Sequence, residues 1–431
     1  MIDRIARGLL SLILCRIRAG TLTVVEDGGR RAYGSGPPAA TIIVRSPAMW
    51  RMALTGSRGL AEAYAQGLWD SPDLTALVRL GARNAAGLDR LRAVIAPVRA
   101  PAQRARAYLR RSTRHRRRRD IAAHYDLGNE LFSRMLDRTM SYSCAVFGDG
   151  VTTLEDAQVA KLELICEKLE LGREDHLLEI GTGWGALAIH AAATRGCRVT
   201  TTTISQTQYD HAVAAVRRAG LEDLVTVLLE DYRDLTGRYD KLVSVEMIEA
   251  VGWRHIGAFL AKCSELLVPD GAMLMQAITI DDRAYEVEKA SRSFINTHIF
   301  PGGCLPSLEV IARSLARRTD MQTVHLEDLT PHYVPTLRHW QRNLADHAGA
   351  LAELGYDERF RRLWRLYLSY CEAGFAERRI CDIQLTLAKP GARPTGVGRF
   401  EPGRFAHART TGLDGERTWP SDVSARRTAS G

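Results

Sequence analysis

Residues 177–185 read LLEIGTGWG, and this stretch decides the fold. Its apolar run contains the acid Glu179 and is followed by three glycines: Gly181, Gly183 and Gly185. Glycines at a first strand-to-helix turn let the chain bend and let a ligand lie against backbone N–H groups. The stretch therefore predicts a strand, a tight turn and a helix N-terminus that together bind a nucleotide-like cofactor.

The spacing of these glycines indicates which cofactor to expect. G-x-G-x-G differs from the G-x-G-x-x-G of dinucleotide-binding proteins. An acid, an apolar residue and then G-x-G-x-G is similar to the motif of S-adenosylmethionine (AdoMet) methyltransferases. We therefore expect AdoMet to lie against Glu179, the three glycines and Trp184. The alternative is a plain tight turn of an α/β protein.

Two later strand ends supply further candidates for cofactor binding. The second strand ends at Thr203 and Ile204, where most methyltransferases place an acid that binds the ribose hydroxyls. Ribose recognition here falls to hydroxyl and amide groups, and Gln208 is the nearest amide. After the third strand, Asp231 and Tyr232 suit adenine by hydrogen bonding and by stacking. A simple core position is the alternative for Tyr232.

Strand and helix patterns alternate through residues 120–390. Repeated β-α-β units with apolar strands predict an α/β body whose mostly parallel sheet is covered on both faces. We expect strands at 176–180, 198–203, 225–229, 241–245, 273–278 and 380–388. We expect helices near 153–170, 184–195, 206–219, 254–267, 337–351 and 360–375.

Composition divides the chain into four parts. Residues 1–98 are predicted to form an accessory domain, with short strands at 22–25 and 41–44 around a Gly/Pro turn at 28–38. Residues 99–119 form an Arg-rich linker, residues 120–390 the main domain and residues 391–431 a disordered tail. Hydrophobic residues at 45% and charged residues at 25% exclude a wholly disordered or fibrous protein.

Charge and cysteine usage suggest location and partners. Residues 1–119 carry a net charge of +16 and the remainder −7, so the two parts are expected to contact different partners. The eight cysteines form no C-x-x-C pair, no metal site is predicted, and the thiols are expected to be reduced. The apolar run 9–15 is too short to cross a bilayer. We expect a cytoplasmic protein with peripheral membrane contact.

Three further segments carry a family resemblance. They are HYDLGNELF at 124–132 with MSYSCAVF at 140–147, VSVEMIEAVG at 243–252, and FPGGCLP at 300–306. With the glycine loop, they make residues 120–389 resemble the cyclopropane-fatty-acyl-phospholipid synthases and mycolic acid cyclopropane synthases. The resemblance implies a Rossmann-like AdoMet methyltransferase with a seven-stranded, mostly parallel sheet. It also adds Tyr142 and Ser143 to the expected cofactor site.

The resemblance implies a reaction. In the family, the double bond of a phospholipid acyl chain attacks the AdoMet methyl group, and a bound bicarbonate removes a proton so that a cyclopropane ring closes. The family residues that hold bicarbonate correspond here to Cys144, Glu249 and Tyr333. Gln276 stands where many members have His, so it donates a hydrogen bond but does not titrate.

Other outcomes stay open at this point. The same cation gives a mid-chain methylene or methyl branch if the proton is lost after a hydride shift. A soluble acyl or natural-product substrate is a second alternative, and nucleic-acid binding through the Arg run is a third and disfavoured one. We expect an unsaturated phospholipid as the partner and no nucleic acid. The oligomeric state is open between a monomer and a homodimer.

Overall fold

A seven-stranded sheet forms the centre of the main domain. The computed structural model describes residues 2–84, 128–290 and 293–393. The strand order is β10-β11-β9-β8-β5-β6-β7, and β11 is the strand that runs antiparallel to its neighbours. The bounds are β5 His176–Ile180, β6 Arg198–Thr203, β7 Val225–Leu229, β8 Tyr239–Val245, β9 Leu267–Ile280, β10 Gln322–Asp328 and β11 Ile380–Ala388. The predicted seven-stranded, mostly parallel sheet is confirmed.

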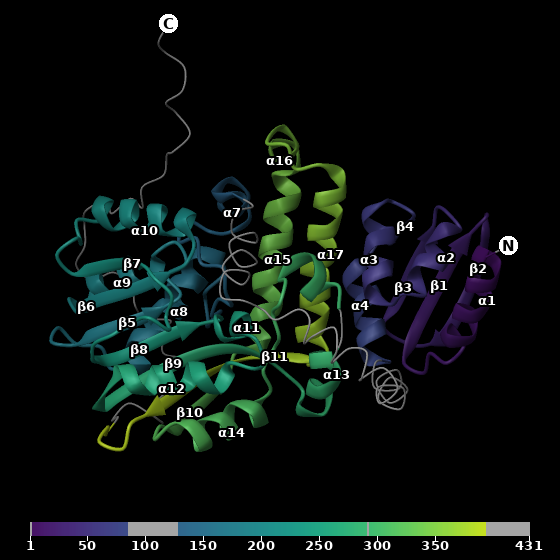
Figure 1. Cartoon of the computed structure of the whole chain (residues 1–431). Coiled ribbons are helices and arrows are strands. Elements are labelled where there is room, and N and C mark those ends of the chain that lie inside the picture. Colours follow the sequence, from purple (N-terminus) through teal and green to yellow (C-terminus); the bar gives the residue numbers. More distant parts are fainter. Residues whose placement is uncertain (1, 85–127, 291–292, 394–431) are drawn as a thin grey trace, which may run out of the picture.

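Helices cover both faces of this sheet (Figure 1). One apolar cluster joins α8 and α9 to β5, β6 and β8, and a second joins α12 and α14 to β8, β9 and β11. Strand β9 is buried almost throughout, as a central strand covered on both faces must be. The bounds are α7 Asn129–Met135, α8 Leu154–Lys168, α9 Ala186–Arg195, α10 Gln206–Arg218, α11 Ile248–Val251, α12 Ile256–Leu266, α13 Tyr285–Ala290, α14 Leu308–Arg318, α15 Thr330–Asp346, α16 Ala348–Glu353 and α17 Glu358–Ala376.

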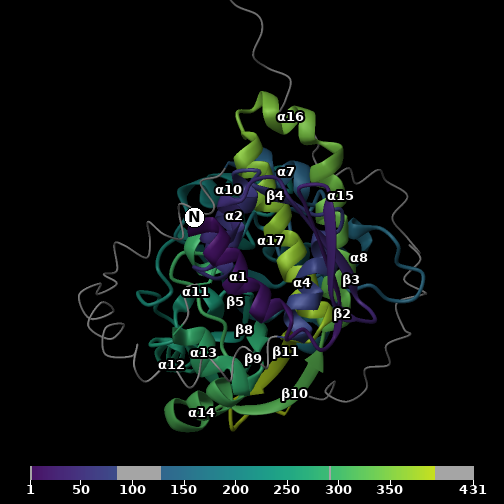
Figure 2. The ribbon, with the colours of Figure 1, turned by 90° about the vertical axis from the view of Figure 1, so that its right-hand side faces the viewer.

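The N-terminal domain is a second, smaller sheet with its own helices. The strand order is β2-β1-β3-β4. The bounds are α1 Ile2–Leu14, β1 Gly20–Glu26, β2 Gly29–Ser35, β3 Ala39–Val44, α2 Ala48–Ala53, α3 Ser57–Ala65, β4 Trp69–Asp70 and α4 Leu74–Arg83. Figures 1 and 2 show α15 and α17 between this domain and the main sheet, with α1 on the outer side.

Two sequence predictions of local structure were wrong. The predicted Gly/Pro turn at 28–38 contains β2, which pairs with β1 through a tight turn at Asp27 and Gly28, both at positive φ. Most of β2 is exposed, so it lacks the apolar alternation that would have revealed a strand. The predicted helix 337–351 is helical apart from His347, but its bounds were wrong. Helix α15 begins earlier, at Thr330, since Pro331 fits its first turn, and it ends at Asp346, after which α16 begins at Ala348.

Several elements were not predicted, among them α7, α11, α13, α14 and β10. Strand β10 shows why, since its residues are exposed or only partly buried and carry no strong apolar pattern. The predicted linker 99–119 and the tail beyond residue 393 lie outside the described residues.

Helix α17 ties the two domains together, and Arg362 is the clearest link. Its guanidinium donates to the carbonyl oxygens of Tyr64 at 2.6 Å and Trp69 at 2.9 Å. It also lies 4.0 Å from the centre of the Tyr64 ring. A guanidinium that pairs with two carbonyls and an aromatic face fixes the orientation of one domain on the other.

We predict that Arg362→Ala lowers the free energy of unfolding by about 2–4 kcal/mol, because it leaves two carbonyl groups without their donor. Thermal or denaturant unfolding measures this. Arg365→Ala, an exposed arginine on the same helix, is the control and should change stability by less than about 0.5 kcal/mol. Equal losses for the two variants would contradict the proposed link.

Candidate active site

The glycine loop after β5 is shaped to receive a cofactor. Gly181, Gly183 and Gly185 have φ of +109°, +54° and +96°, which favour glycine. The backbone N–H groups of Gly181 and Thr182 both donate to the carbonyl of Thr202 at 3.0 Å, which fixes the loop against β6. A side chain built at Gly183 would meet no atom within 4 Å, so space for a ligand lies beside this backbone. The predicted AdoMet loop fits its cofactor.

The other predicted cofactor residues lie at the same edge of the sheet. Thr203 Oγ1 is 2.8 Å from Gln208 Oε1, and both side chains are buried. Asp231 accepts from Arg233 Nε at 2.8 Å, and the Tyr232 ring packs edge-on against Phe259 at 5.2 Å. Ile204 is partly exposed between β6 and α10. Their shared position follows from the parallel sheet, because the carboxyl ends of its strands meet at one edge.

Glu179 lies below the glycine loop and is buried. Its Oε2 accepts from Thr201 Oγ1 at 2.6 Å. Burial raises the pKa of Glu179 to about 8, partly offset by this hydrogen bond and by Lys161. Glu179 is therefore a buried group tied to β6.

Aromatic side chains form one wall of the site. Tyr142 lies 5.2 Å from Trp340 and 5.2 Å from Phe132, and Phe132 lies 4.9 Å from Trp184. The hydroxyl of Tyr142 is 2.7 Å from that of Tyr367. These rings come from α7, α15, α17, the loop between α7 and α8, and the turn between β5 and α9, so this wall depends on the tertiary fold. Aromatic faces of this kind stabilise a nearby cation by about 0.5–2 kcal/mol.

Ser143 and Cys144 connect this wall to a buried cation. Lys161 on α8 is only 2% exposed, and its Nζ donates to Ser143 Oγ at 2.7 Å. The thiol of Cys144 is buried, and burial raises its pKa well above the ordinary value. A thiol held in its neutral form is a poor nucleophile, so Cys144 contributes through its backbone N–H.

Three of the four predicted catalytic residues converge on one carboxylate. The backbone N–H of Cys144 donates to Glu246 Oε1 at 2.8 Å, and Gln276 Nε2 donates to the same oxygen at 2.9 Å. The Tyr333 hydroxyl donates to Glu246 Oε2 at 2.5 Å. These are three of the groups expected to hold bicarbonate. In this structure they bind a carboxylate of the chain itself, so the donor set does not fit bicarbonate at this position.

Glu249, the fourth predicted catalytic residue, lies beside this set. Its Oε1 accepts from the backbone N–H of Ile278 at 2.5 Å, and its buried Oε2 has no hydrogen-bond partner among the described residues. Burial, together with the neighbouring Glu246, raises the pKa of Glu249 to about 8. Glu249 is therefore mostly protonated at neutral pH. A protonated carboxyl group can donate a hydrogen bond to an anion, so its expected role as a holder of bicarbonate stays a prediction.

Asp382 on β11 completes a group of three acids. Its Oδ2 accepts from Gln276 Nε2 at 2.9 Å, and burial together with Glu246 and Glu249 raises its pKa well above the ordinary value. Burial also raises the pKa of Glu246, while its three donors and Lys161 lower it. Negative charges repel one another strongly where little water is present, so the three acids cannot all be ionised. One buried lysine and several hydrogen-bond donors favour one ionised carboxylate among the three.

Sequence reasoning did not select Glu246, Asp382, Lys161 or Tyr367. Glu246 had a usable signal, because it is an acid directly after a strand of the parallel sheet, where ligand sites form. Lys161 also had one, since it lies among apolar residues on the buried side of α8. Asp382 and Tyr367 come from the C-terminal part, and the site gains them only when β11 and α17 pack against it.

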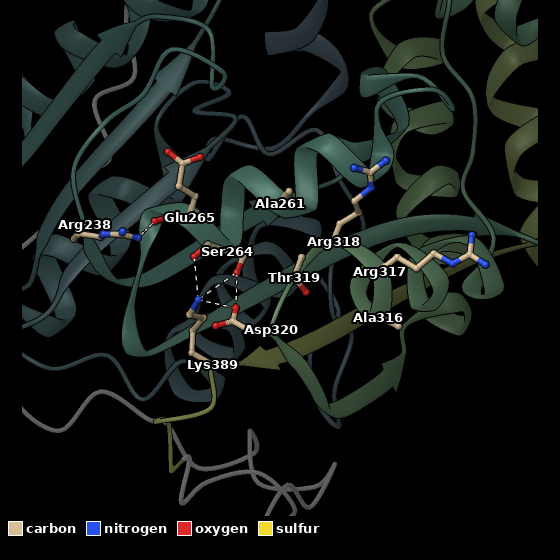
Figure 3. Close-up of a pocket in the computed structure, with 10 residues that line it drawn as sticks. All are labelled: Arg238, Ala261, Ser264, Glu265, Ala316, Arg317, Arg318, Thr319, Asp320 and Lys389. Atoms are coloured by element: carbon tan, nitrogen blue, oxygen red, sulfur yellow. Dashed lines mark hydrogen bonds and ion pairs between the residues drawn. The ribbon is translucent and has the colours of Figure 1, made fainter.

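A surface groove lies away from this site. It runs between α12 and α14 and is bordered by Ser264, Asp320 and Lys389, which bond to one another (Figure 3). A neighbouring basic groove contains Arg254, Arg313 and Arg317. Neither groove contains a residue of the site around Glu246, so neither is assigned to catalysis.

Comparison with known proteins identifies the family. The family model of mycolic acid cyclopropane synthetases matches residues 112–385. The chain belongs to this family. The tuberculostearic acid methyltransferase UfaA1 of Mycobacterium tuberculosis is 37% identical over 390 residues, which is 86% of this chain and 88% of that protein. The cyclopropane-fatty-acyl-phospholipid synthase of Escherichia coli is 37% identical over 370 residues, which is 84% and 90%.

Solved structures agree with this assignment. The cyclopropane synthase MmaA2 of Mycobacterium tuberculosis has a TM-score of 0.59 and 33% identity, over 63% of this chain and 98% of that chain. The mycolic acid cyclopropane synthase CmaA1, complexed with SAH and CTAB, has a TM-score of 0.59 and 31% identity over the same shares. The chain is thus a methyltransferase of the cyclopropane-synthase type, as predicted, and the related CmaA1 is one whose solved structure holds SAH.

We predict that Gly183→Ala weakens AdoMet binding at least tenfold, because the new methyl group points into the space beside the loop and strains a left-handed residue. Isothermal titration calorimetry with AdoMet measures this. Gly220→Ala is a matched control, since Gly220 has φ +65° and also no neighbour within 4 Å of the added carbon. Similar affinity losses for both variants would mean that strain alone, and not the ligand, explains the effect.

We predict that Glu249→Gln stabilises the protein increasingly as the pH rises from 5 to 8. The folded-state pKa of about 8 lies above the unfolded value near 4.5. The free energy of unfolding of the wild type therefore falls progressively as the pH rises through this range, whereas Gln has no such dependence. Residual solvent contact limits the gain to about 1–3 kcal/mol at pH 8. Chemical denaturation at both pH values measures it, with exposed Glu353→Gln as the control. A stability difference independent of pH would contradict the raised pKa.

Proposed function

We propose that the enzyme transfers a one-carbon unit from AdoMet to the cis double bond of an unsaturated phospholipid acyl chain and forms a cyclopropane ring. The observation that supports this most directly is the convergence of Cys144, Gln276 and Tyr333 on the carboxylate of one residue, whose chain neighbour Met247 lies against the glycine loop at Gly181. Such a position suits a proton acceptor for a cation formed next to the methyl donor.

Each part of the site has a task in this reaction. When bound, AdoMet supplies the electrophilic methyl group. The residues at the glycine loop, Thr203, Gln208 and Asp231 are proposed to hold and orient it. The rings of Tyr142, Tyr333 and Trp340 exclude water and face the developing positive charge. A polar acceptor beyond this wall then receives a proton.

A second product has a specific observation in its favour. UfaA1, one of the relatives that matches most of this chain, is a tuberculostearic acid methyltransferase. Loss of the proton after a hydride shift gives a mid-chain methylene group, which a reductase converts to a methyl branch. Both outcomes need the same methyl donor and the same proton acceptor, so the site residues support either one.

The experiment is to incubate purified enzyme with AdoMet and vesicles of a cis-monounsaturated phospholipid, and to analyse the lipid by NMR. The expected product shows the upfield signals of a cyclopropane ring and no olefinic methylene signals. Mass alone does not distinguish the two products because they are isomers. An unchanged alkene, with methylation of an oxygen or nitrogen elsewhere, would contradict the proposal.

We also propose that α1 contacts the membrane surface. Ala6 is buried on one side of the helix. The other side exposes an apolar row, between 44% and 66% exposed, formed by Ile2, Ile5, Leu9, Leu12 and Ile13. An amphipathic helix with nearby arginines suits the interface of anionic lipid. Within the described residues, all helices are too short or too polar to cross a bilayer. The Arg-rich linker 99–119 lies outside them.

We predict that Leu9→Gln combined with Leu12→Gln lowers binding to anionic vesicles at least tenfold. A leucine side chain that becomes fully buried in the membrane contributes about 1.5–3 kcal/mol to binding. Flotation on phosphatidylglycerol vesicles measures this. The control combines Leu308→Gln with Leu354→Gln, two exposed leucines elsewhere on the surface. Equal binding by both double variants would exclude α1 as the contact.

A further inference from the structure

Glu246 has a backbone conformation that its residue type disfavours. It follows Val245, the last residue of β8, and has φ +47°. A non-glycine residue in the left-handed region costs about 1–2 kcal/mol, and such strain gathers at functional sites. Its N–H donates to the carbonyl of Gln276 at 2.9 Å, which holds the turn to β9. The turn directs the side chain to the donors of Cys144, Gln276 and Tyr333.

The hydrogen bonds distinguish the two carboxylate oxygens. Oε1 accepts from Cys144 N–H and from Gln276 Nε2, which uses both of its lone pairs. Within the described part of the chain, Oε2 accepts one bond, from Tyr333. Its second lone pair therefore remains for a proton. Glu246 as a residue keeps partial exposure, while Cys144, Gln276 and Tyr333 are buried.

Gln276 is itself held on several sides, so the donor set is rigid. Its Nε2 also donates to Asp382 at 2.9 Å, and its Oε1 accepts from Gln384 Nε2 at 3.0 Å. The Oε1 of Gln384 in turn accepts from Lys168 Nζ at 2.6 Å. An amide fixed in this way cannot carry a proton, which leaves Glu246 as the titrating group that contacts all three donors.

We propose that Glu246 is the built-in base of the reaction and replaces the bicarbonate that the family resemblance implied. The proton-transfer step balances without another reactant. The C–H bond of the newly transferred methyl group breaks, its electron pair forms the second ring bond to the cationic carbon, and the proton bonds to Glu246 Oε2. The carboxylate becomes a neutral carboxylic acid and returns its proton to solvent after product release. This proposal rests on the proposed function.

The first test needs no variant. Product formation by the wild-type enzyme is measured in buffer freed of carbon dioxide and again with added bicarbonate. We expect rates that agree within about twofold, because the donors already bind a carboxylate. A wild-type rate that collapses without bicarbonate and returns with it would overturn the proposal.

Two variants of Glu246 test the carboxylate itself. Glu246→Gln keeps the shape and removes the base, so turnover should fall about 10²–10⁴-fold with AdoMet affinity unchanged. Glu246→Gly relieves the left-handed strain and empties the position before the donors. It should be equally inactive in bicarbonate-free buffer and regain activity with bicarbonate or formate. Near-normal turnover of Glu246→Gln, or an unrescued Glu246→Gly, would contradict the assignment. Exposed Glu353→Gln is the control.

A binding measurement separates this proposal from the proposed function. Titration with ¹³C-bicarbonate, followed by NMR, should detect binding to Glu246→Gly and none to the wild-type site, whatever the lipid product is. Bicarbonate binding of equal strength to wild type and to Glu246→Gly would overturn the built-in base. If the wild type leaves the alkene unchanged while the binding result holds, the proposed function fails and the anion-site assignment stands.

Discussion

The site must hold three acidic side chains where little water reaches them, and this requirement constrains the surrounding structure. Glu246, Glu249 and Asp382 lie close enough for their ionisations to interact, and burial raises the pKa of each. An isolated buried carboxylate is costly, so it is tolerated only with donors or a cation nearby. Cys144, Gln276 and Tyr333 supply the donors and Lys161 supplies the cation. This arrangement favours a single ionised carboxylate at Glu246.

The scaffold around the acids explains why so many elements are needed. Tyr333 comes from α15, Asp382 from β11, Gln276 from β9 and Lys161 from α8. These elements are separated by long stretches of chain, and each is fixed by its own packing. Tyr333 stacks on Phe375 of α17 at 4.2 Å, and α17 in turn is bonded to the N-terminal domain through Arg362. The accessory domain therefore supports the helix pair that forms the aromatic wall.

The donor set also explains how Gln276 is compatible with the chemistry. A histidine at this position would add a titrating group beside the anion. An amide donates without changing charge, so the ionisation of the site rests on its carboxylates. With an acid already in the chain, a neutral donor is sufficient. Gln in place of His at position 276 and an acid at position 246 therefore belong together: the acid supplies the charge and the amide supplies a neutral donor. This differs from the bicarbonate site that the resemblance implied.

Local patterns in the sequence were sufficient to locate the main domain. The glycine loop at 181–185 and the apolar strands 176–180, 198–203, 225–229 and 380–388 were correctly located, because local bending and burial on two faces leave strong patterns. The sequence also brought Cys144, Gln276 and Tyr333 forward as site residues. Exposed elements such as β2 and β10 escaped prediction, since solvent-facing residues carry little apolar periodicity.

Only the tertiary structure decided which group those donors bind. In the sequence, Glu246 and Glu249 are two acids of the same motif, three residues apart. The family resemblance pointed to Glu249, whereas the position directly after a strand pointed to Glu246. The left-handed turn at Glu246 and the packing of β9, β11 and α15 direct one carboxyl group to three donors and the other to the backbone of Ile278. Hydrogen-bond partners from distant segments set this difference, and their positions exist only once the chain has folded.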